Sequence, residues 1–340
     1  MGRELSVFAR AQVCNIFLFA KLAYVLQVLH CARRKVQAIH RIFAAFVWRS
    51  QWEPMRRDNL FLPLEGGGVG LVHLFVHQLV SRFFFFKSAN DPFLVAVLIR
   101  RLSFHLPYLF APTVQAREGT LWGFLKEVAD TFNFLTVRFS LDYLYSLSRK
   151  QMTQALTESL FPTPLYRQPY LGSLDISVLK RVRRMCIQAA AKTFFFKLHT
   201  ATLPVKTFLN DKGMFVPWNV NCRLCNVPET IDHCFILCRD AMFFWDILQR
   251  TLKKDIEITP YTIRFLPVDK NSVVPYDVFV LMGLFSLWKS RMMDRHAEPP
   301  RSSKSVFREQ CALVRSVYAA RDEPPSWLPC LDACVCLPEF

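Results

Sequence analysis

Four cysteines and a histidine lie close together in residues 220–248, VNCRLCNVPETIDHCFILCRDAMFFWDIL. The spacing Cys222-x2-Cys225-x7-His233-x4-Cys238 suits a structural zinc site. In such sites a Cys-x2-Cys turn brings two thiolates onto one ion, and a histidine and a further cysteine complete the tetrahedron. Because the protein would fill all four ligand positions, a single Zn²⁺ held here would be structural and would leave no position open for catalysis.

A fourth cysteine, Cys234, is a competing ligand. Cys234 and Cys238 are four residues apart, which places both thiols on one face of a helix. His233 and Cys238 are five residues apart and would be separated by about 140° on a straight α-helix. A site that uses His233 therefore requires the helix to end or bend before Cys238. The residues alone leave both ligand sets open, beside a chance grouping in a chain with eleven cysteines.

The cysteine count and the apolar runs favour an intracellular protein, in the nucleus or the cytoplasm. No cleavable signal peptide is seen, and eleven cysteines cannot all pair, so close cysteines are metal ligands or core residues before they are disulfides. The first apolar run begins near Val13 and is broken by Lys21. The run 278–288 is shorter than the roughly 20 residues that span a bilayer. We expect both runs to be buried helices, without stable membrane insertion.

The charge balance favours a polyanionic partner. The chain has 43 Lys and Arg residues against 27 Asp and Glu residues, a formal net charge of +16. We predict that basic helices contact the phosphates of RNA or single-stranded DNA without reading sequence, although a solvated basic face is the simpler alternative. The candidate nucleic-acid-binding residues are Arg33, Arg34, Lys35, Arg56, Arg57, Lys180, Arg181, Arg183, Arg184, Lys197, Arg223 and Arg239.

Apolar residues recur at three-to-four spacing over most of the chain, which predicts a mainly α-helical fold. Residues 4–29 contain no Gly or Pro, and 33–48 and 176–199 continue the same pattern. Residues 66–70 are rich in glycine, but the lysine of a phosphate-binding loop is missing, so we expect a tight turn there. Little sheet is expected beyond a short ribbon at the cysteine cluster.

The stretch KLHTATLPVKTFLNDKGMFVPWNVNCRLCNVPETIDHCFILCRDAMFFW resembles the C-terminal zinc-binding region of reverse transcriptases from LINE-type (non-LTR) retrotransposons. The matching positions include His199, Leu203, Pro204, Leu209, Gly213, Cys222, Cys225, Glu229, Thr230, His233, Cys238 and Trp245. The resemblance favours His233 over Cys234. It therefore implies a small helical domain with one structural Zn²⁺ on a CCHC ligand set.

Three further blocks are similar to the segment that follows the polymerase palm in the same elements. They are LSVFARAQVCNIFLFAKLAYVLQVL, FVW at 46–48 and LFLPLEGGGVGLVHL at 60–74, although the family's usual Gly before the Arg is Ala9 here. LFSLWKSRM at 284–292 resembles the family's W-x-x-R helix after the zinc site. The resemblance implies a thumb/connection-like helical region at 1–92, a helical linker region at 93–175, a zinc-binding domain at 176–297 and a flexible tail at 298–340.

The palm of these enzymes uses paired aspartates to hold two catalytic metal ions, and no Asp-Asp pair occurs in this chain. We therefore expect no enzyme activity from this chain, whereas homologous full-length proteins would be RNA-directed DNA polymerases. The resemblance implies a truncated, non-catalytic C-terminal segment of a retrotransposon reverse transcriptase. Such a segment would bind nucleic acid through its basic helices and zinc knuckle, and the upstream palm of the same polyprotein is a further candidate partner. The alternative is a transposon-derived structural or protein-interaction module that binds no nucleic acid.

Overall fold

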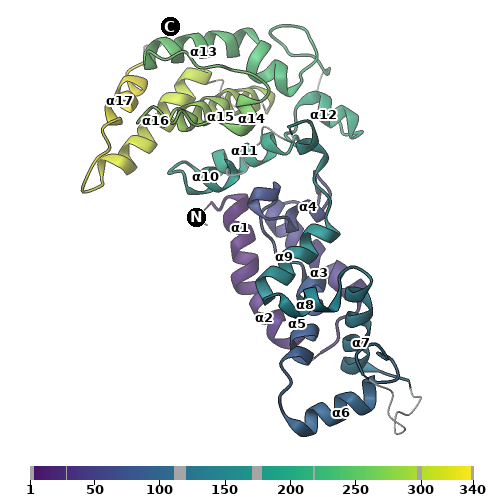
Figure 1. Cartoon of the computed structure of the whole chain (residues 1–340). Helices are drawn as coiled ribbons and strands as arrows, with labels where there is room; N and C mark the ends of the chain where they lie inside the picture. The colour runs from purple at the N-terminus through teal and green to yellow at the C-terminus, as the bar shows by residue number, and fades with distance from the viewer. Residues whose placement is uncertain are drawn as a thin grey trace. The chain divides into compact units, whose positions relative to one another are not determined.

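The computed structural model describes residues 4–27, 29–110, 120–170, 178–216, 219–296 and 301–337. Over these residues the chain is helical and contains no β-strand (Figure 1). A single isolated antiparallel bridge joins Asn221 to Pro228, where a short ribbon was expected. The predicted mainly α-helical fold is confirmed for the described part of the chain.

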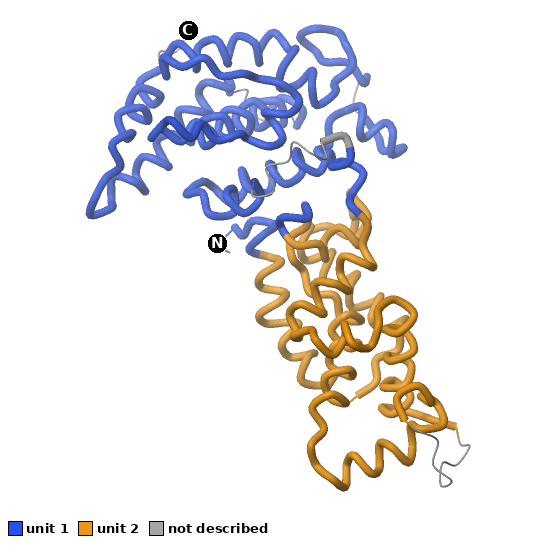
Figure 2. The backbone as a smooth tube through the Cα atoms, in the orientation of Figure 1, with its two compact units in different colours: residues 1–9, 64–67, 163–340 blue, residues 10–63, 68–162 orange. Residues whose placement is uncertain are grey.

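The chain forms two compact units, which we describe separately (Figure 2). Unit 1 comprises residues 1–9, 64–67 and 163–340, and unit 2 comprises residues 10–63 and 68–162. The four-part division expected from the sequence stays a prediction beside this two-unit description.

Unit 2 is built from the N-terminal helices and those that follow them up to residue 162. A helical run consists of α1 (Val7–Val13), whose first three residues belong to unit 1, a π-helical segment (Cys14–Phe19) and α2 (Ala20–Leu26). It is followed by α3 (Arg33–Trp48), α4 (Asp58–Phe61), α5 (Leu74–Lys87), α6 (Pro92–Leu102), α7 (Gly123–Thr136), α8 (Leu141–Ser146) and α9 (Arg149–Leu160). Leu26, Val36 and Leu74 from α2, α3 and α5 form one buried apolar cluster, which fixes the inner face of α3.

The first helical run is less buried than its all-round apolar sequence led us to expect. Its outer side chains Ile16, Phe17 and Tyr24 are 62%, 61% and 77% exposed. Among the described residues, Val7–Leu26 is the one helix with the length and apolar composition of a membrane span, which by itself is weak support for one. The expectation was wrong for this outer face because an apolar sequence does not supply the neighbours that would cover it. By contrast, residues 278–288 are buried throughout, as predicted.

The glycine-rich segment is a tight turn, as predicted. Gly67 and Gly70 have positive φ values of 88° and 68°, which non-glycine residues rarely adopt. A Cβ atom on Gly68 would lie 2.1 Å from the carbonyl oxygen of Leu62, so only glycine fits that close backbone approach.

Unit 1 holds the cysteine cluster and the C-terminal helices. It contains a 3₁₀ turn (Leu165–Tyr170), α10 (Val178–Arg184), α11 (Ala189–His199), α12 (Lys206–Asp211), a π-helical segment (His233–Leu237), α13 (Arg239–Leu252), α14 (Thr262–Phe265), α15 (Tyr276–Arg295), α16 (Ser303–Ala319) and α17 (Leu328–Val335).

Helix α15 is the buried centre of unit 1. Gly283 allows α13 to approach closely, since a Cβ atom there would lie 2.8 Å from the Phe244 ring. Within the segment that the sequence placed in a flexible tail, Ser303–Ala319 and Leu328–Val335 instead form α16 and α17. Helix α16 buries an apolar face that includes Val306 and Phe307.

Candidate metal centre

Three local features place the four predicted ligands. Cys222 and Cys225 lie on a tight knuckle in which Asn226 N donates to Cys222 O at 2.9 Å and Asn226 has a φ of 54°. His233 begins the π-helical segment, and Cys238 ends it with an extended backbone, φ −68° and ψ 139°. The helix therefore breaks at Cys238, as the five-residue spacing from His233 required.

The ligand atoms of Cys222, Cys225, His233 and Cys238 all lie within 4.8 Å of one another. Cys225 Sγ and Cys238 Sγ are 3.8 Å apart, far beyond a disulfide bond of about 2.05 Å. A tetrahedral ion with Zn–S bonds of about 2.3 Å separates two sulfur ligands by about 3.8 Å. The group could bind one metal ion, and its thiolate and imidazole donors suit zinc.

The geometry groups His233, and not Cys234, with the other three candidate ligands. His233 is 5% exposed, and its Nε2 atom is buried without a hydrogen-bond partner, as expected of a nitrogen reserved for a metal. Cys234 is fully buried and does not belong to the four-residue group. Burial raises the pKa of the Cys234 thiol, which favours the neutral form of a core residue.

Helix α15 supplies an arginine to the site, which the sequence analysis did not identify. Arg291 Nη1 lies 3.6 Å from Cys222 Sγ. Burial alone would raise the pKa of the Cys222 thiol, but interactions with Arg291, His233 and nearby backbone N–H groups lower it to about 6. A thiol with such a pKa is largely thiolate at neutral pH, the form that binds metal.

Glu229 joins the knuckle to α12 and α15. Its carboxylate is buried and forms an ion pair with Arg295, while Arg291 Nη1 lies 3.8 Å from the other carboxylate oxygen. The backbone N–H of Lys206 donates to Glu229 Oε1 at 3.3 Å, and Thr207 Oγ1 donates to Glu229 O at 3.0 Å. Glu229 thus has a structural role, because it anchors the knuckle to two helices.

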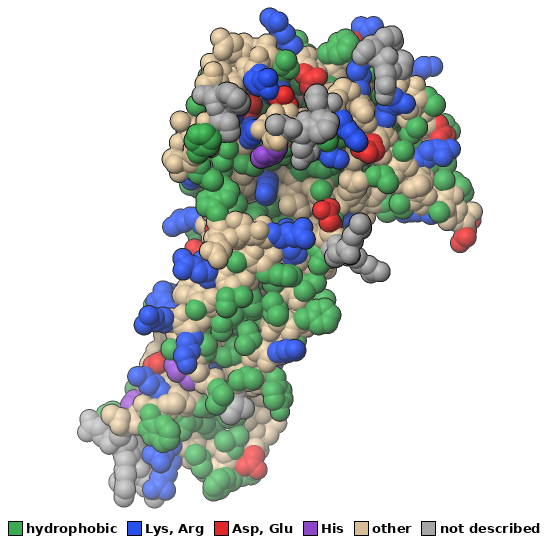
Figure 3. Space-filling model, turned by 180° about the vertical axis from the view of Figure 1, so that it is seen from behind, with side chains coloured by type: hydrophobic (Ala, Val, Ile, Leu, Met, Phe, Trp, Pro, Cys, Tyr) green, Lys and Arg blue, Asp and Glu red, His purple; other side chains and the backbone are tan. Residues whose placement is uncertain are grey.

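The basic residues of α3 are exposed. Arg33, Arg34 and Lys35 are exposed, as are Arg41 and Arg49 on the same helix and at its C-terminus. None of these side chains forms an ion pair within the described part of the chain. Figure 3 shows Lys and Arg side chains along one edge of unit 2, with few acidic side chains among them.

Two of the basic residues of α10 form ion pairs within the chain. Lys180 Nζ is 2.5 Å from Glu65 Oε1. Arg181 pairs with the buried carboxylate of Asp277 at 3.4 Å, and it donates to the carbonyl oxygens of Phe265 and Leu266. Arg181 is therefore a structural residue of unit 1, whereas Arg184 is exposed.

The other residues predicted to contact nucleic acid do not lie together on one surface. Arg57 pairs with Glu53 four residues before it, and Arg56 is exposed. Arg223 pairs with Asp294 at 2.8 Å, and Arg239 is exposed at the start of α13. Lys197 is half-buried on α11. The structure thus gathers unpaired basic side chains on α3 and leaves the rest of the predicted set dispersed or paired.

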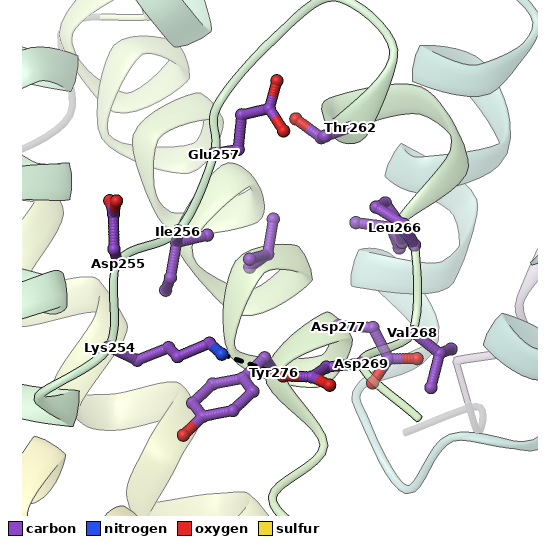
Figure 4. Close-up of a pocket in the computed structure, with 12 residues that line it drawn as sticks. Lys254, Asp255, Ile256, Glu257, Thr262, Leu266, Val268, Asp269, Tyr276 and Asp277 are labelled. Carbon is purple, nitrogen blue, oxygen red and sulfur yellow. Dashed lines mark hydrogen bonds and ion pairs between the residues drawn. The ribbon is translucent and has the colours of Figure 1, made fainter. Parts of the chain in front are cut away.

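A cavity of about 230 Å³ lies beside the N-terminus of α15 (Figure 4). Lys254 reaches across it to Asp269 at 2.8 Å, next to the ring of Tyr276. The remaining lining mixes acidic side chains, such as Glu257, with apolar ones, such as Leu266. Because its one lysine is paired within the chain and its other charges are acidic, this cavity does not suit a phosphate ligand.

Arg291 and Glu229 are the residues near the centre whose role sequence reasoning missed. The W-x-x-R block at 284–292 contains Trp288 and Arg291, so this motif could have indicated Arg291 as a residue of the site. Spacing alone could not show that Arg291 reaches a thiol 69 positions earlier in the chain. No known protein-family model matches this sequence, and no curated protein matches it either.

Proposed function

We propose that this chain is a non-catalytic nucleic-acid-binding protein. Its α3 face contacts the phosphates of RNA or single-stranded DNA, and one structural Zn²⁺ on Cys222, Cys225, His233 and Cys238 folds the knuckle of unit 1. This assignment agrees with the resemblance to the C-terminal part of LINE-type reverse transcriptases. The observation that carries it is the exposed, unpaired basic face of α3.

The charge of α3 is directed outward by the packing of its opposite face. Val36, Phe43 and Val47 are buried, so the helix cannot turn its basic side inward. Arg34 and Arg41 are seven residues apart and about 20° apart in projection on an α-helix, which places both on the outer side. A phosphate backbone can therefore meet several guanidinium groups at once.

Apolar side chains accompany these charges. Ile42 is 63% exposed, and Phe46 and Trp52 are 39% and 38% exposed. Unpaired bases stack on exposed aromatic rings with little sequence preference, and each stacked base contributes about 1–3 kcal/mol. Single-stranded nucleic acid therefore suits this surface better than a duplex, whose bases are already stacked.

The zinc ion has a folding role in this proposal. Its four ligands come from the knuckle and from both ends of the π-helical segment, so one ion would join these pieces. Metal-binding free energy is then folding free energy for the segment. The chain itself supplies no nucleotidyl transfer, so we expect no primer extension with added Mg²⁺ and nucleotides.

A salt titration of the zinc-loaded chain against a fluorescent single-stranded RNA tests the proposal. Each neutralised phosphate releases counterions, so the log–log slope of affinity against salt should be about −0.7 per contact. Several contacts from α3 predict a slope of about −2 or steeper, with similar affinity for unrelated sequences. Absence of binding at low salt would contradict the proposal.

The exposed apolar face of the first helical run favours the second candidate, a protein-interaction module. Ile16, Phe17 and Tyr24 offer a surface that a protein partner would cover. The same titration distinguishes the two candidates, because a module of this kind would show no salt-dependent RNA binding.

A further inference from the structure

Arg291 lies where a buried positive charge needs a specific explanation. Its side chain is 12% exposed, and Nη1 approaches both Cys222 Sγ at 3.6 Å and Glu229 Oε2 at 3.8 Å. Its Nε and Nη2 atoms are buried without hydrogen-bond partners. A buried guanidinium is costly unless an anion compensates it.

Glu229 does not compensate this charge alone, because Arg295 already pairs with it. Arg295 is 10% exposed and contacts Glu229 Oε1, and it also donates to Pro204 O at 2.9 Å. Two buried arginines thus share one buried carboxylate. One positive charge is left over in this ion-pair cluster.

The metal centre would supply the missing negative charge. Zn²⁺ with three thiolates and one neutral imidazole carries a net charge of −1, and Arg291 contacts one of those sulfurs. The total over the centre, Glu229, Arg291 and Arg295 is then zero. A four-cysteine centre would carry −2 and would leave an excess negative charge in the same place.

We propose that Arg291 is the counter-ion of the zinc–thiolate centre: its guanidinium lies against Cys222 Sγ and stabilises the bound metal through that ligand. Arg291 is thus a positioning residue that acts on the metal through a ligand. This inference rests on the zinc assignment above. It explains why α15, which is remote in sequence from the knuckle, ends in a basic turn against it.

The test compares Arg291→Lys, which keeps the charge, with Arg291→Gln, which keeps hydrogen-bonding capacity without charge. Arg223→Gln is the matched control, because Arg223 lies on the same knuckle but is exposed and paired with Asp294. Zinc affinity of the full chain is measured by competition with a chromophoric chelator. The sulfur-to-cobalt charge-transfer band of the Co²⁺-substituted chain reports on the thiolates directly.

We expect Arg291→Gln to weaken zinc binding about 10–100-fold, the usual effect of losing a partner of a metal ligand. The cobalt band should move to lower energy, because thiolates without a counter-ion are more electron-rich. Arg291→Lys should stay within about threefold of the wild type with an unshifted band, since lysine restores the point charge. The Arg223→Gln control should match the wild type in both measurements.

Equal losses in the Gln and Lys variants would overturn the inference, because shape rather than charge would then matter. A Gln variant with wild-type affinity and spectrum would overturn it as well. If Arg291→Gln does not fold in excess zinc, Arg291→Lys decides: wild-type affinity and spectrum support the inference, and weakened binding overturns it. A wild-type chain that binds no zinc would instead remove the underlying metal assignment.

Discussion

Helices α3 and α10 begin with similar basic runs, yet their charges face different surroundings. Arg33, Arg34 and Lys35 on α3 are exposed and without ion pairs in the described part of the chain. On α10, Lys180 pairs with Glu65, and Arg181 is bound to a buried carboxylate and two backbone carbonyls. The first run is available to a polyanion, and two of the four basic residues of the second run are paired within the fold.

The difference follows from the distribution of acidic residues. Residues 10–63 contain nine Lys or Arg residues and two Asp or Glu residues, so most of their positive charges have no partner nearby. Residues 178–296 contain eighteen basic and ten acidic residues, and several of these form buried pairs. A basic run thus predicts nucleic-acid contact only where the rest of the segment leaves it unpaired.

Zinc removal should have the largest effect and should act on unit 1 alone. Structural zinc contributes about 10–16 kcal/mol of binding free energy in small zinc-finger peptides, so Cys222→Ser should unfold the knuckle. Hydrogen exchange would show lost protection over 220–238, while RNA affinity stays within about threefold of the wild type if α3 is the contact surface. Cys336→Ser, at an exposed cysteine, is the matched control. A parallel collapse of RNA binding would mean that the knuckle is itself the contact surface.

Arg181→Ala should have the second-largest effect, a loss of stability of unit 1. It leaves the Asp277 carboxylate, which is 8% exposed, without its cation and two carbonyl groups without a donor. Removing one partner of a buried pair costs about 3–5 kcal/mol, and the 23% exposure of Arg181 reduces this to about 2–3 kcal/mol. Urea unfolding of unit 1 measures the loss, with Arg184→Ala as control. If Arg181→Ala instead weakened RNA binding without loss of stability, α10 would belong to the binding surface.

Acid should destabilise unit 2 through His40, which is buried, and His73, which is half-buried. Burial lowers the pKa of His40 to about 4 and that of His73 to about 3, and each ring accepts a backbone N–H bond at the start of α5. The unfolded chain therefore binds more protons below pH 6.5, so stability falls as pH drops from that value towards 4. Each histidine contributes at most about 1.4 kcal/mol per pH unit.

Hydrogen exchange of α3 and α5 at pH 7 and pH 5, corrected for intrinsic rates, measures this loss. His40→Gln should reduce the pH dependence, because an amide oxygen can accept the Leu74 N–H without titrating. An unchanged dependence in that variant would show that His40 is not one of the groups responsible.

Arg223→Ala should have the smallest effect. The pair with Asp294 is exposed on both sides, 65% and 52%, and such pairs contribute about 0–1 kcal/mol. Stability by urea unfolding should change by less than about 0.5 kcal/mol, and RNA affinity by less than about twofold. A larger loss of RNA affinity would add the knuckle to the contact surface.

Local patterns in the sequence predicted most of the helical fold and a cysteine–histidine cluster that could hold a metal ion. Three-to-four apolar spacing predicted helices, and the spacing of His233 and Cys238 required the break that the structure shows at Cys238. These predictions succeed because they depend on residues close together in the chain, whose geometry is fixed by helix and turn parameters.

Contacts between distant residues could not be predicted in the same way. Arg181 meets Asp277 across 96 positions, and Arg291 meets Cys222 across 69. The exposed face of the first helical run was also missed, because an apolar sequence says nothing about which neighbours cover it. Long-range pairing, rather than local propensity, decides which charges remain available.

One RNA titration with two matched triple variants tests the central claim most directly. Arg33→Ala/Arg34→Ala/Arg41→Ala removes three charges from α3, and Lys180→Ala/Arg183→Ala/Arg184→Ala removes three from α10 but spares Arg181. The α3 variant should weaken binding at least about tenfold and flatten the log–log salt slope by about 2, while the α10 variant stays within about threefold of the wild type. Wild-type binding by the α3 variant, with lost binding by the α10 variant, would contradict the account.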